Sequence, residues 1–255
     1  MNPFSFRGSN AVSFGIDRVE KLADDIAELD PKTPEIAVIG DFGVAKAGIL
    51  DRIRSILARS EYDVTVFSEL TGEPHATVVD QVAHVLRRLD HPIVVGVGGG
   101  SALDVAKLAA VIAEDEFAAE DYALCARPFP QPGLKRILIP TTAGTGSEVT
   151  RTAVFTTRKG KKVWAWGDEL LPEMVLLDPS LTLSLPAEIT AATGLDAMVH
   201  AIEACTCQNR NPMADALGLH AIRLAGKHLM VAIEKPGDIE ARSGMLIAST
   251  LAGFA

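Results

Sequence analysis

The chain has 255 residues, of which 48% are hydrophobic, and it carries a formal net charge of −9. This length and apolar content suffice for a sizeable core in one or two domains, and the negative charge disfavours a nucleic-acid backbone as partner. No continuous apolar run approaches the roughly 18 residues of a membrane helix, and residues 1–10 lack the apolar segment of a signal peptide. Three cysteines, Cys125, Cys205 and Cys207, offer no disulfide framework. We therefore expect a cytoplasmic protein that binds neither nucleic acid nor a membrane.

Segments typical of strands alternate with segments typical of helices over the first half of the chain. The sequence predicts a short extended piece at 11–15, helices at 16–29, 44–59, 76–89 and 102–112, and strands at 35–41, 63–70, 93–97 and 134–142. This alternation favours a Rossmann-like α/β domain, with a parallel, doubly wound sheet and helices on both faces. Ligands of such sheets bind at the carboxyl ends of the strands.

A glycine-rich turn divides the segment PIVVGVGGGSALDVAKLAAVIA (92–113) into a predicted buried strand and a predicted helix. Glycines let a ligand approach the backbone, and the unpaired N–H groups at the start of a helix can bind a phosphate. Gly96-x-Gly98, without a glycine at position 101, is not the full dinucleotide fingerprint, so a simple tight turn is the alternative. Asp104 and Lys107 fit either reading, since an acid in the first turn is an ordinary dipole partner and a lysine there can be a solvated surface charge.

A second loop rich in hydroxyl groups, PTTAGTGSEVT (140–150), directly follows a predicted strand. Thr141, Thr142, Thr145 and Ser147 can bind a phosphate or a ribose, although such residues also satisfy their own backbone in ordinary loops. Because two glycine-containing loops follow two strands of one predicted sheet, both should open at the same edge.

The pattern changes after this loop. Two short strand-like segments around RKGKK predict a hairpin, and 173–179 is the last strand signal. Helices are predicted at 187–205, 213–234 and 239–252. We place a domain boundary near Leu183, which gives an α/β domain at 1–183 and an all-helical domain at 184–255.

Asp196 and His200 lie four residues apart on the first of these helices, so both side chains project from one face. A carboxylate and an imidazole at this spacing can hold a divalent metal from one side. The alternative is a hydrogen bond between them at the surface. His220 and His228 carry little weight as ligands, and we expect at least one of them to be exposed.

The segments GGGSALDVAK, PTTAGTGSEVT and GLDAMVHAIEA, in this order and spacing, resemble the iron-dependent (group III) alcohol dehydrogenases. Asp41 after the strand at 35–41 and Pro74 after the strand at 63–70 fit the same family. The resemblance implies the fold of dehydroquinate synthase and glycerol dehydrogenase, with a dinucleotide-binding domain followed by a helical domain. It also implies NAD(P)-dependent, metal-assisted interconversion of a small alcohol and an aldehyde or ketone.

The same resemblance implies the roles of individual residues. Gly98, Gly99 and Ser101 would hold the pyrophosphate, and Asp104 would face the cofactor. The nicotinamide side would be lined by Thr141, Thr142 and Thr145, while Lys162 would reach the ribose or a phosphate. Asp196 and His200 match the first two ligands of the metal, which would be Fe²⁺, with Zn²⁺ as the alternative.

Members of this family commonly add two histidine ligands further along, and the chain has no matching segment before Ala255. The C-terminal part of the family's fold is therefore expected to be missing, together with half of the metal site. A polyol (glycerol) dehydrogenase, a dehydroquinate synthase-like enzyme and a nucleotide-binding module without catalysis remain the alternatives.

Two further expectations concern the cofactor and the assembly. Asp41 could accept hydrogen bonds from the adenosine ribose and repel a 2′-phosphate, which favours NAD over NADP. Its alternative role is to cap the helix that follows. The segment 11–15 or the hairpin could pair with a second subunit as an edge strand, which predicts a homodimer or a higher homo-oligomer.

Overall fold

The computed structural model describes residues 4, 6, 11–30, 35–130 and 133–255, so the expectation of a chain start without a signal peptide lies almost wholly outside the described residues. A six-stranded sheet forms the centre of the first part, with the strand order β1-β8-β5-β4-β2-β3. Every neighbouring pair of these strands is parallel. The strands are β1 (Ala11–Phe14), β2 (Glu35–Asp41), β3 (Asp63–Leu70), β4 (Ile93–Gly98), β5 (Arg136–Pro140) and β8 (Met174–Leu177).

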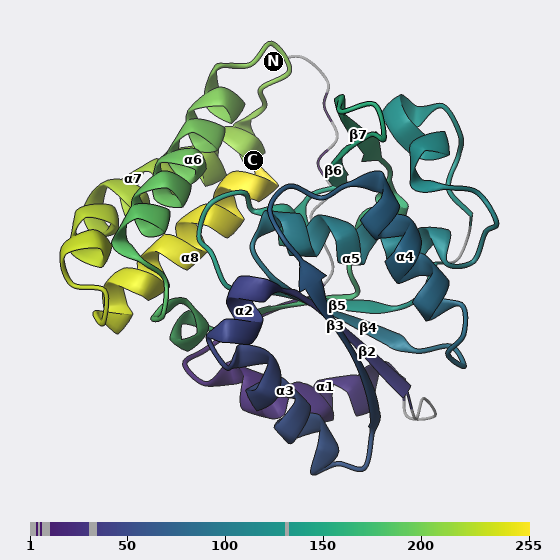
Figure 1. The fold of residues 1–255 in the computed structure, drawn as a ribbon. Coiled ribbons are helices and arrows are strands. Elements are labelled where there is room, and N and C mark those ends of the chain that lie inside the picture. The colour runs from purple at the N-terminus through teal and green to yellow at the C-terminus, as the bar shows by residue number, and fades with distance from the viewer. Residues whose placement is uncertain (1–3, 5, 7–10, 31–34, 131–132) are drawn as a thin grey trace.

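Helices cover both faces of this sheet, as Figure 1 shows. One face is packed by α1 (Leu22–Leu29), α2 (Phe42–Lys46) and α3 (Ile49–Ala58), and the other by α4 (Ala76–Leu86) and α5 (Gly100–Ile112). All residues of β4 are buried, because this central strand has helices above and below it. The predicted Rossmann-like α/β arrangement is confirmed.

Two predicted helices differ in detail from the observed ones. The segment 16–29 begins with a 3₁₀ turn (Arg18–Lys21) before α1, after Asp17 in a left-handed conformation with φ 56°. The segment 44–59 is split into α2 and α3 at Gly48, whose φ is +75°. A left-handed residue ends the repeating backbone hydrogen bonds, and apolar spacing alone does not reveal such breaks.

The predicted hairpin is confirmed as a separate antiparallel pair of strands, β6 (Thr152–Thr156) and β7 (Lys162–Trp166). Its inward residues, Phe155, Val163 and Ala165 among them, join the core beneath α4 and α5. The exposed side chains of Trp164 and Trp166 alternate with them, as the two-residue period of a strand requires.

The second part consists of α6 (Ala187–Thr206), α7 (Pro212–Glu234) and α8 (Ile239–Phe254), close to the predicted spans. These helices lie together on one side of the sheet (Figure 1). The expectation about membranes needs one qualification, because α7 is long and apolar enough to cross one, with a mean hydropathy of 1.2. A single such helix is weak support for a span, since core helices of water-soluble proteins pass the same test. The division at Leu183 stays a prediction.

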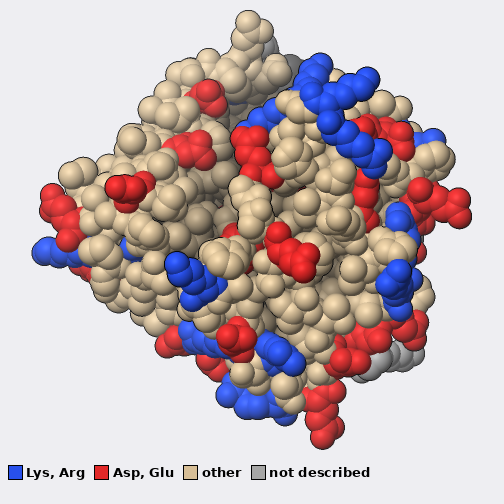
Figure 2. Space-filling view, viewed as in Figure 1, with Lys and Arg blue, Asp and Glu red and all other residues tan. Residues whose placement is uncertain are grey.

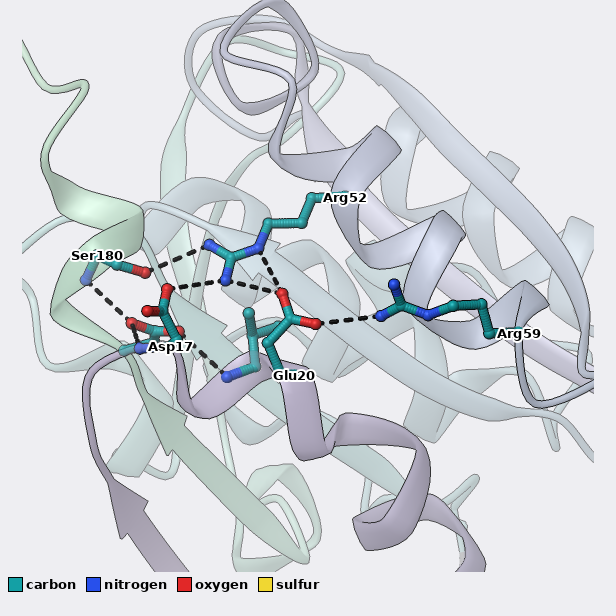
Figure 3. Close-up of polar contacts among 7 residues, drawn as sticks. Asp17, Glu20, Arg52, Arg59 and Ser180 are labelled. Carbon is teal, nitrogen blue, oxygen red and sulfur yellow. Dashed lines mark hydrogen bonds and ion pairs between the residues drawn. The ribbon is translucent and has the colours of Figure 1, made fainter.

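A polar cluster ties the start of the chain to α3 and to the end of β8 (Figure 3). The Arg52 guanidinium pairs with Asp17 and Glu20 at 2.9 Å, and Glu20 also pairs with Arg59 at 3.1 Å. Asp178, which is fully buried, accepts hydrogen bonds from the backbone amides of Asp17, Val19 and Ser180. The cluster thereby joins the 3₁₀ turn that follows β1 to α3 and to the end of β8.

Candidate functional site

A cleft of about 1160 Å³ lies between the α/β part and the three helices. Figure 2 shows the surface hollowed between the helical part on the left and the α/β part on the right. Its walls come from the ends of β2, β3, β4 and β5, from the start of β7, and from one face of α6 and the end of α8. The cleft therefore opens at the carboxyl edge of the sheet, where ligands of this architecture bind.

The glycine turn between β4 and α5 forms the floor of the cleft. Gly99, Gly100 and Ser101 line it, whereas Gly98 does not. Gly98 has φ +150°, and a Cβ there would come within 2.7 Å of the Ala102 side chain, so only glycine fits. Gly99 caps α5 and offers no side-chain acceptor, which leaves the first amides of the helix available to an anion.

Asp41 stands at the carboxyl end of β2 and lines the cleft. Its Oδ1 accepts a hydrogen bond of 2.9 Å from the Val44 amide, so the capping role considered as the alternative is present. The second oxygen, Oδ2, lies beside the glycine turn, 2.9 Å from where a Cβ on Gly98 would stand. The carboxylate can therefore cap α2 and face a ligand with its other oxygen.

The loop after β5 brings hydroxyl groups to the cleft next to the glycine turn. Thr142 and Thr145 line it, together with Ser147 and Thr150. Thr141 is buried and absent from the cleft wall; its amide donates a 2.9 Å hydrogen bond to the Gly98 carbonyl. The predicted meeting of the two loops at one edge of the sheet is confirmed.

Asp104 lies at the cleft wall, yet both of its carboxylate oxygens are held by the protein. Oδ1 accepts a 2.5 Å hydrogen bond from the Ser147 hydroxyl and pairs with Lys107 Nζ at 3.1 Å. Oδ2 accepts a 3.0 Å hydrogen bond from the Val154 amide. The carboxylate thus joins α5 to the β5 loop and to the hairpin.

The interpretation of Lys107 as a solvated surface charge is wrong, because the side chain is completely buried. It lies on the face of α5 that the β5 loop and β6 cover, which apolar periodicity could not reveal. Burial lowers the pKa of Lys107, and the carboxylate of Asp104 opposes that shift.

Lys162, at the start of β7, lines the far side of the cleft. Its ammonium pairs with Glu73 at 3.0 Å, and both side chains are largely exposed. The partner carboxylate lowers the effective positive charge at this position, and such an exposed pair is easily opened by a competing anion. Lys162 is therefore placed where a ribose or phosphate could be reached.

Asp196 and His200 project from α6 into the cleft, with Asp196 Oδ1 3.7 Å from His200 Nε2. Both are half-exposed on the cleft side, so a metal could reach them. Among the described residues, no group of three or more His, Cys, Asp or Glu side chains gathers around a common centre. Of the other histidines considered, His220 is exposed and His228 is buried, and neither lines the cleft.

Sequence reasoning missed several lining residues on and just after α6. Thr193 precedes Asp196 by three residues and Glu203 follows it by seven, and both line the cleft from the same helix face. Helical spacing from the Asp196 and His200 pair would have found these two. Cys207 also lines the cleft, just beyond the end of α6. Gly100 was missed as well, although its amide belongs to the same turn as Gly99.

The described residues fit a nicotinamide dinucleotide and half of a metal site. A glycine turn at the start of a helix suits a pyrophosphate, because its backbone amides can be approached closely. A Cβ on Gly100 would come within 2.7 Å of Thr145 Oγ1 and fill the space between the glycine turn and the loop after β5. The carboxylate and imidazole of Asp196 and His200 suit Fe²⁺ or Zn²⁺ as two ligands. The remaining ligands of such an ion have no counterpart among the described side chains.

Comparison with protein families gives two matches that together span most of the chain. The model described as "Iron-containing alcohol dehydrogenase" matches residues 9–179. A second, described as "Fe-containing alcohol dehydrogenase family, C-terminal", matches residues 190–255.

Proteins of similar sequence include alcohol dehydrogenases and aldehyde reductases. The chain is 40% identical to long-chain-alcohol dehydrogenase 1 of Geobacillus thermodenitrificans over 243 residues, which is 94% of this chain and 61% of that protein. It is 33% identical to sulfoacetaldehyde reductase of Bilophila wadsworthia, again over 94% of this chain and 62% of the relative. The chain thus spans about three fifths of the length of these relatives.

Solved structures share the fold over the whole chain. The sulfoacetaldehyde reductase of Bifidobacterium kashiwanohense in complex with NAD⁺ superimposes with a TM-score of 0.92 at 36% identity, covering 100% of this chain and 67% of the other. A 1,3-propanediol oxidoreductase gives a TM-score of 0.91 at 32% identity, covering 100% of this chain and 66% of the other.

Proposed function

Because the chain belongs to the iron-containing alcohol dehydrogenase family, we propose that it supports NAD-linked, metal-assisted interconversion of an alcohol and an aldehyde or ketone. The observation that carries this proposal is a single cleft lined by Gly99 and Ser101, by the hydroxyls after β5, and by Asp196 and His200. These three groups suit a pyrophosphate, a nicotinamide riboside and a metal, in that order across the cleft.

Each part of the cleft has a defined task. The amides at the start of α5 bind the pyrophosphate, and the free Oδ2 of Asp41 accepts from the adenosine ribose and disfavours the 2′-phosphate of NADP. Thr142 and Thr145 orient the nicotinamide riboside. Lys162 reaches a ribose or phosphate from the opposite wall. A bound nicotinamide cofactor supplies the hydride acceptor or donor.

Asp196 and His200, from one face of α6, would supply two ligands to Fe²⁺, or to Zn²⁺ as the alternative. When bound, such an ion would contribute Lewis acidity toward the alcohol or carbonyl oxygen. No general base is assigned among the described residues.

The proposal extends to the cellular compartment and to the oligomeric state. Three free thiols suit a reducing compartment such as the cytoplasm, and the acidic chain is a poor ligand for nucleic acid. Among the described strands β1 is an edge of the six-stranded sheet, and an edge strand can pair with a second copy in a homo-oligomer.

A binding titration and a turnover assay test the proposal together. NADH fluorescence should change saturably on mixing with the chain, and alcohol-dependent reduction of NAD should require added Fe²⁺ or Zn²⁺ and stop with a chelator. Binding without turnover would favour a nucleotide-binding module. Absence of NADH binding by the folded chain would refute the proposal.

A further inference from the structure

Lys107 is the only lysine among the fully buried side chains of the described residues, and its ammonium is surrounded by oxygen atoms. Nζ donates to the Ser147 carbonyl at 2.8 Å and to the Thr152 carbonyl at 2.5 Å. Longer contacts reach the carbonyl and hydroxyl of Thr150, and Asp104 Oδ1 lies at 3.1 Å. The Lys107 ammonium thus links the two ends of the turn from Ser147 to Thr152 through their carbonyl oxygens.

That turn is part of the cleft wall. Thr145, Ser147, Thr150 and Thr152 line it, and Thr145 Oγ1 accepts a 3.2 Å hydrogen bond from the Ser147 amide. The Ser147 hydroxyl is in turn held by Asp104 at 2.5 Å. The position of Thr145 in the cleft therefore depends on Ser147, and Ser147 depends on Lys107 and Asp104.

The loop that leads into this turn lies between the glycine turn and α8. On one side, ideal Cβ positions on Gly99 and Gly100 fall 3.3 Å and 2.7 Å from the side chains of Thr142 and Thr145. On the other side, Gly146, with φ +61°, meets the backbone of α8 so closely that a Cβ would stand 2.8 Å from the Gly253 Cα. In the proposed function, this loop forms the nicotinamide end of the cleft.

Burying an ammonium is costly unless its donors are paired, and here they meet the carbonyls of Ser147 and Thr152 and the carboxylate of Asp104. Replacing the cation by an apolar group would remove the one donor that joins the Ser147 and Thr152 carbonyls to Asp104, and would leave the Asp104 carboxylate without its cationic partner. The turn would then relax toward the cleft, and Thr145 would move with it. The glycine turn would be less affected, because its conformation is set by Gly98 and by α5 itself.

We propose that Lys107 is a positioning residue for the nicotinamide half of the cofactor, acting through Asp104, Ser147 and Thr145. This rests on the proposed NAD-linked function. The ammonium touches neither cofactor nor substrate; it holds the turn that does. The adenosine and pyrophosphate half of the cofactor binds independently of it.

The test compares two ligands, NADH and ADP-ribose, which lacks the nicotinamide, by titration calorimetry. Lys107→Met keeps the side-chain length without the charge. We expect its Kd for NADH to rise about tenfold, as for the loss of one charged hydrogen-bond network, while its Kd for ADP-ribose stays within about threefold. Lys227→Met is the matched control, because Lys227 is exposed on α7, where it pairs with Glu240 at 3.5 Å; it should change neither Kd.

A second variant keeps the proposal testable if Lys107→Met does not fold. Ser147→Ala removes one hydroxyl and leaves the carbonyl that Lys107 binds, and it should weaken NADH selectively by about threefold. Equal losses for the two ligands, or no loss for either, would overturn the positioning role while leaving the proposed function intact. Failure of the unaltered chain to bind both ligands would overturn the two proposals together.

Discussion

The Thr250 hydroxyl donates a 2.8 Å hydrogen bond to the Glu148 carboxyl group, and both side chains are buried. Glu148 belongs to the loop after β5, and Thr250 belongs to α8, so this contact joins the α/β part to the helices beside the cleft. Burial is the main cause that raises the pKa of Glu148 above its usual value of 4.5.

Glu148→Gln should stabilise the chain at neutral pH but not in acid. Below pH 4.5 the carboxyl group is protonated in both the folded and the unfolded chain, so the variant gains nothing. Above pH 4.5 the unfolded chain releases this proton while the folded chain keeps it up to its raised pKa, so the native chain loses stability over that range, which the amide retains.

Urea unfolding at several pH values measures this difference. The free energy of unfolding of Glu148→Gln, relative to the unaltered chain, should increase between pH 4.5 and 7. Glu114→Gln is the control, since Glu114 is exposed and should give a flat difference. A gain that is constant with pH would contradict the prediction.

Asp41→Asn separates the two roles of this residue. The amide oxygen can still accept from the Val44 amide, so α2 keeps its cap, while the negative charge in the cleft is lost. The ratio of NADPH to NADH affinity should rise about tenfold, because a 2′-phosphate is no longer repelled. Titration calorimetry with both cofactors measures the ratio, and Asp51→Asn on the exposed face of α3 should leave it unchanged. An unaltered ratio in Asp41→Asn would leave Asp41 as a helix cap only.

Gly99→Ala places a methyl group on the floor of the cleft. The backbone accepts it, since φ is −77°, but the Cβ would press on Thr142 at 3.3 Å and stand where the pyrophosphate approaches. NADH affinity should fall about tenfold or more. Gly226→Ala in α7, where nothing lies within 4 Å, should leave affinity intact and raise stability by up to about 1 kcal/mol. Unchanged calorimetric affinity in folded Gly99→Ala would mean that the turn serves the fold alone.

Divalent metal should bind this 255-residue chain weakly and exchange readily. Asp196 and His200 offer two ligands from one helix face, while iron and zinc sites usually have three or four protein ligands. Equilibrium dialysis with Zn²⁺ should show easily reversed binding that Asp196→Asn and His200→Gln each abolish. His220→Gln, on the exposed face of α7, serves as the control. Stoichiometric metal that survives dialysis would show that other residues complete the site.

The order of strands and helices could be predicted from the sequence because it depends on local periodicity and on glycines. The alternation of buried strands with amphipathic helices up to residue 142 led to the parallel sheet, and Gly99 and Gly100 marked the floor of the cleft. The spacing of Asp196 and His200 placed them on one helix face, and the structure brings that face to the cleft. Each of these features is encoded within about twenty neighbouring residues.

Other features depend on which segments meet in three dimensions. In the sequence, Lys107 cannot be distinguished from a surface lysine of a helix. It is buried, and binds the Ser147 and Thr152 carbonyls, because the β5 loop and β6 pack over α5. Glu148 is similarly unremarkable in the sequence until α8 covers it. The sequence by itself determined the elements and the motifs, since hydrophobic spacing and backbone freedom act locally. Tertiary structure decided which charges are buried, because the Ser147 carbonyl that Lys107 binds and the Thr250 hydroxyl that Glu148 binds are 40 and 102 residues away along the chain.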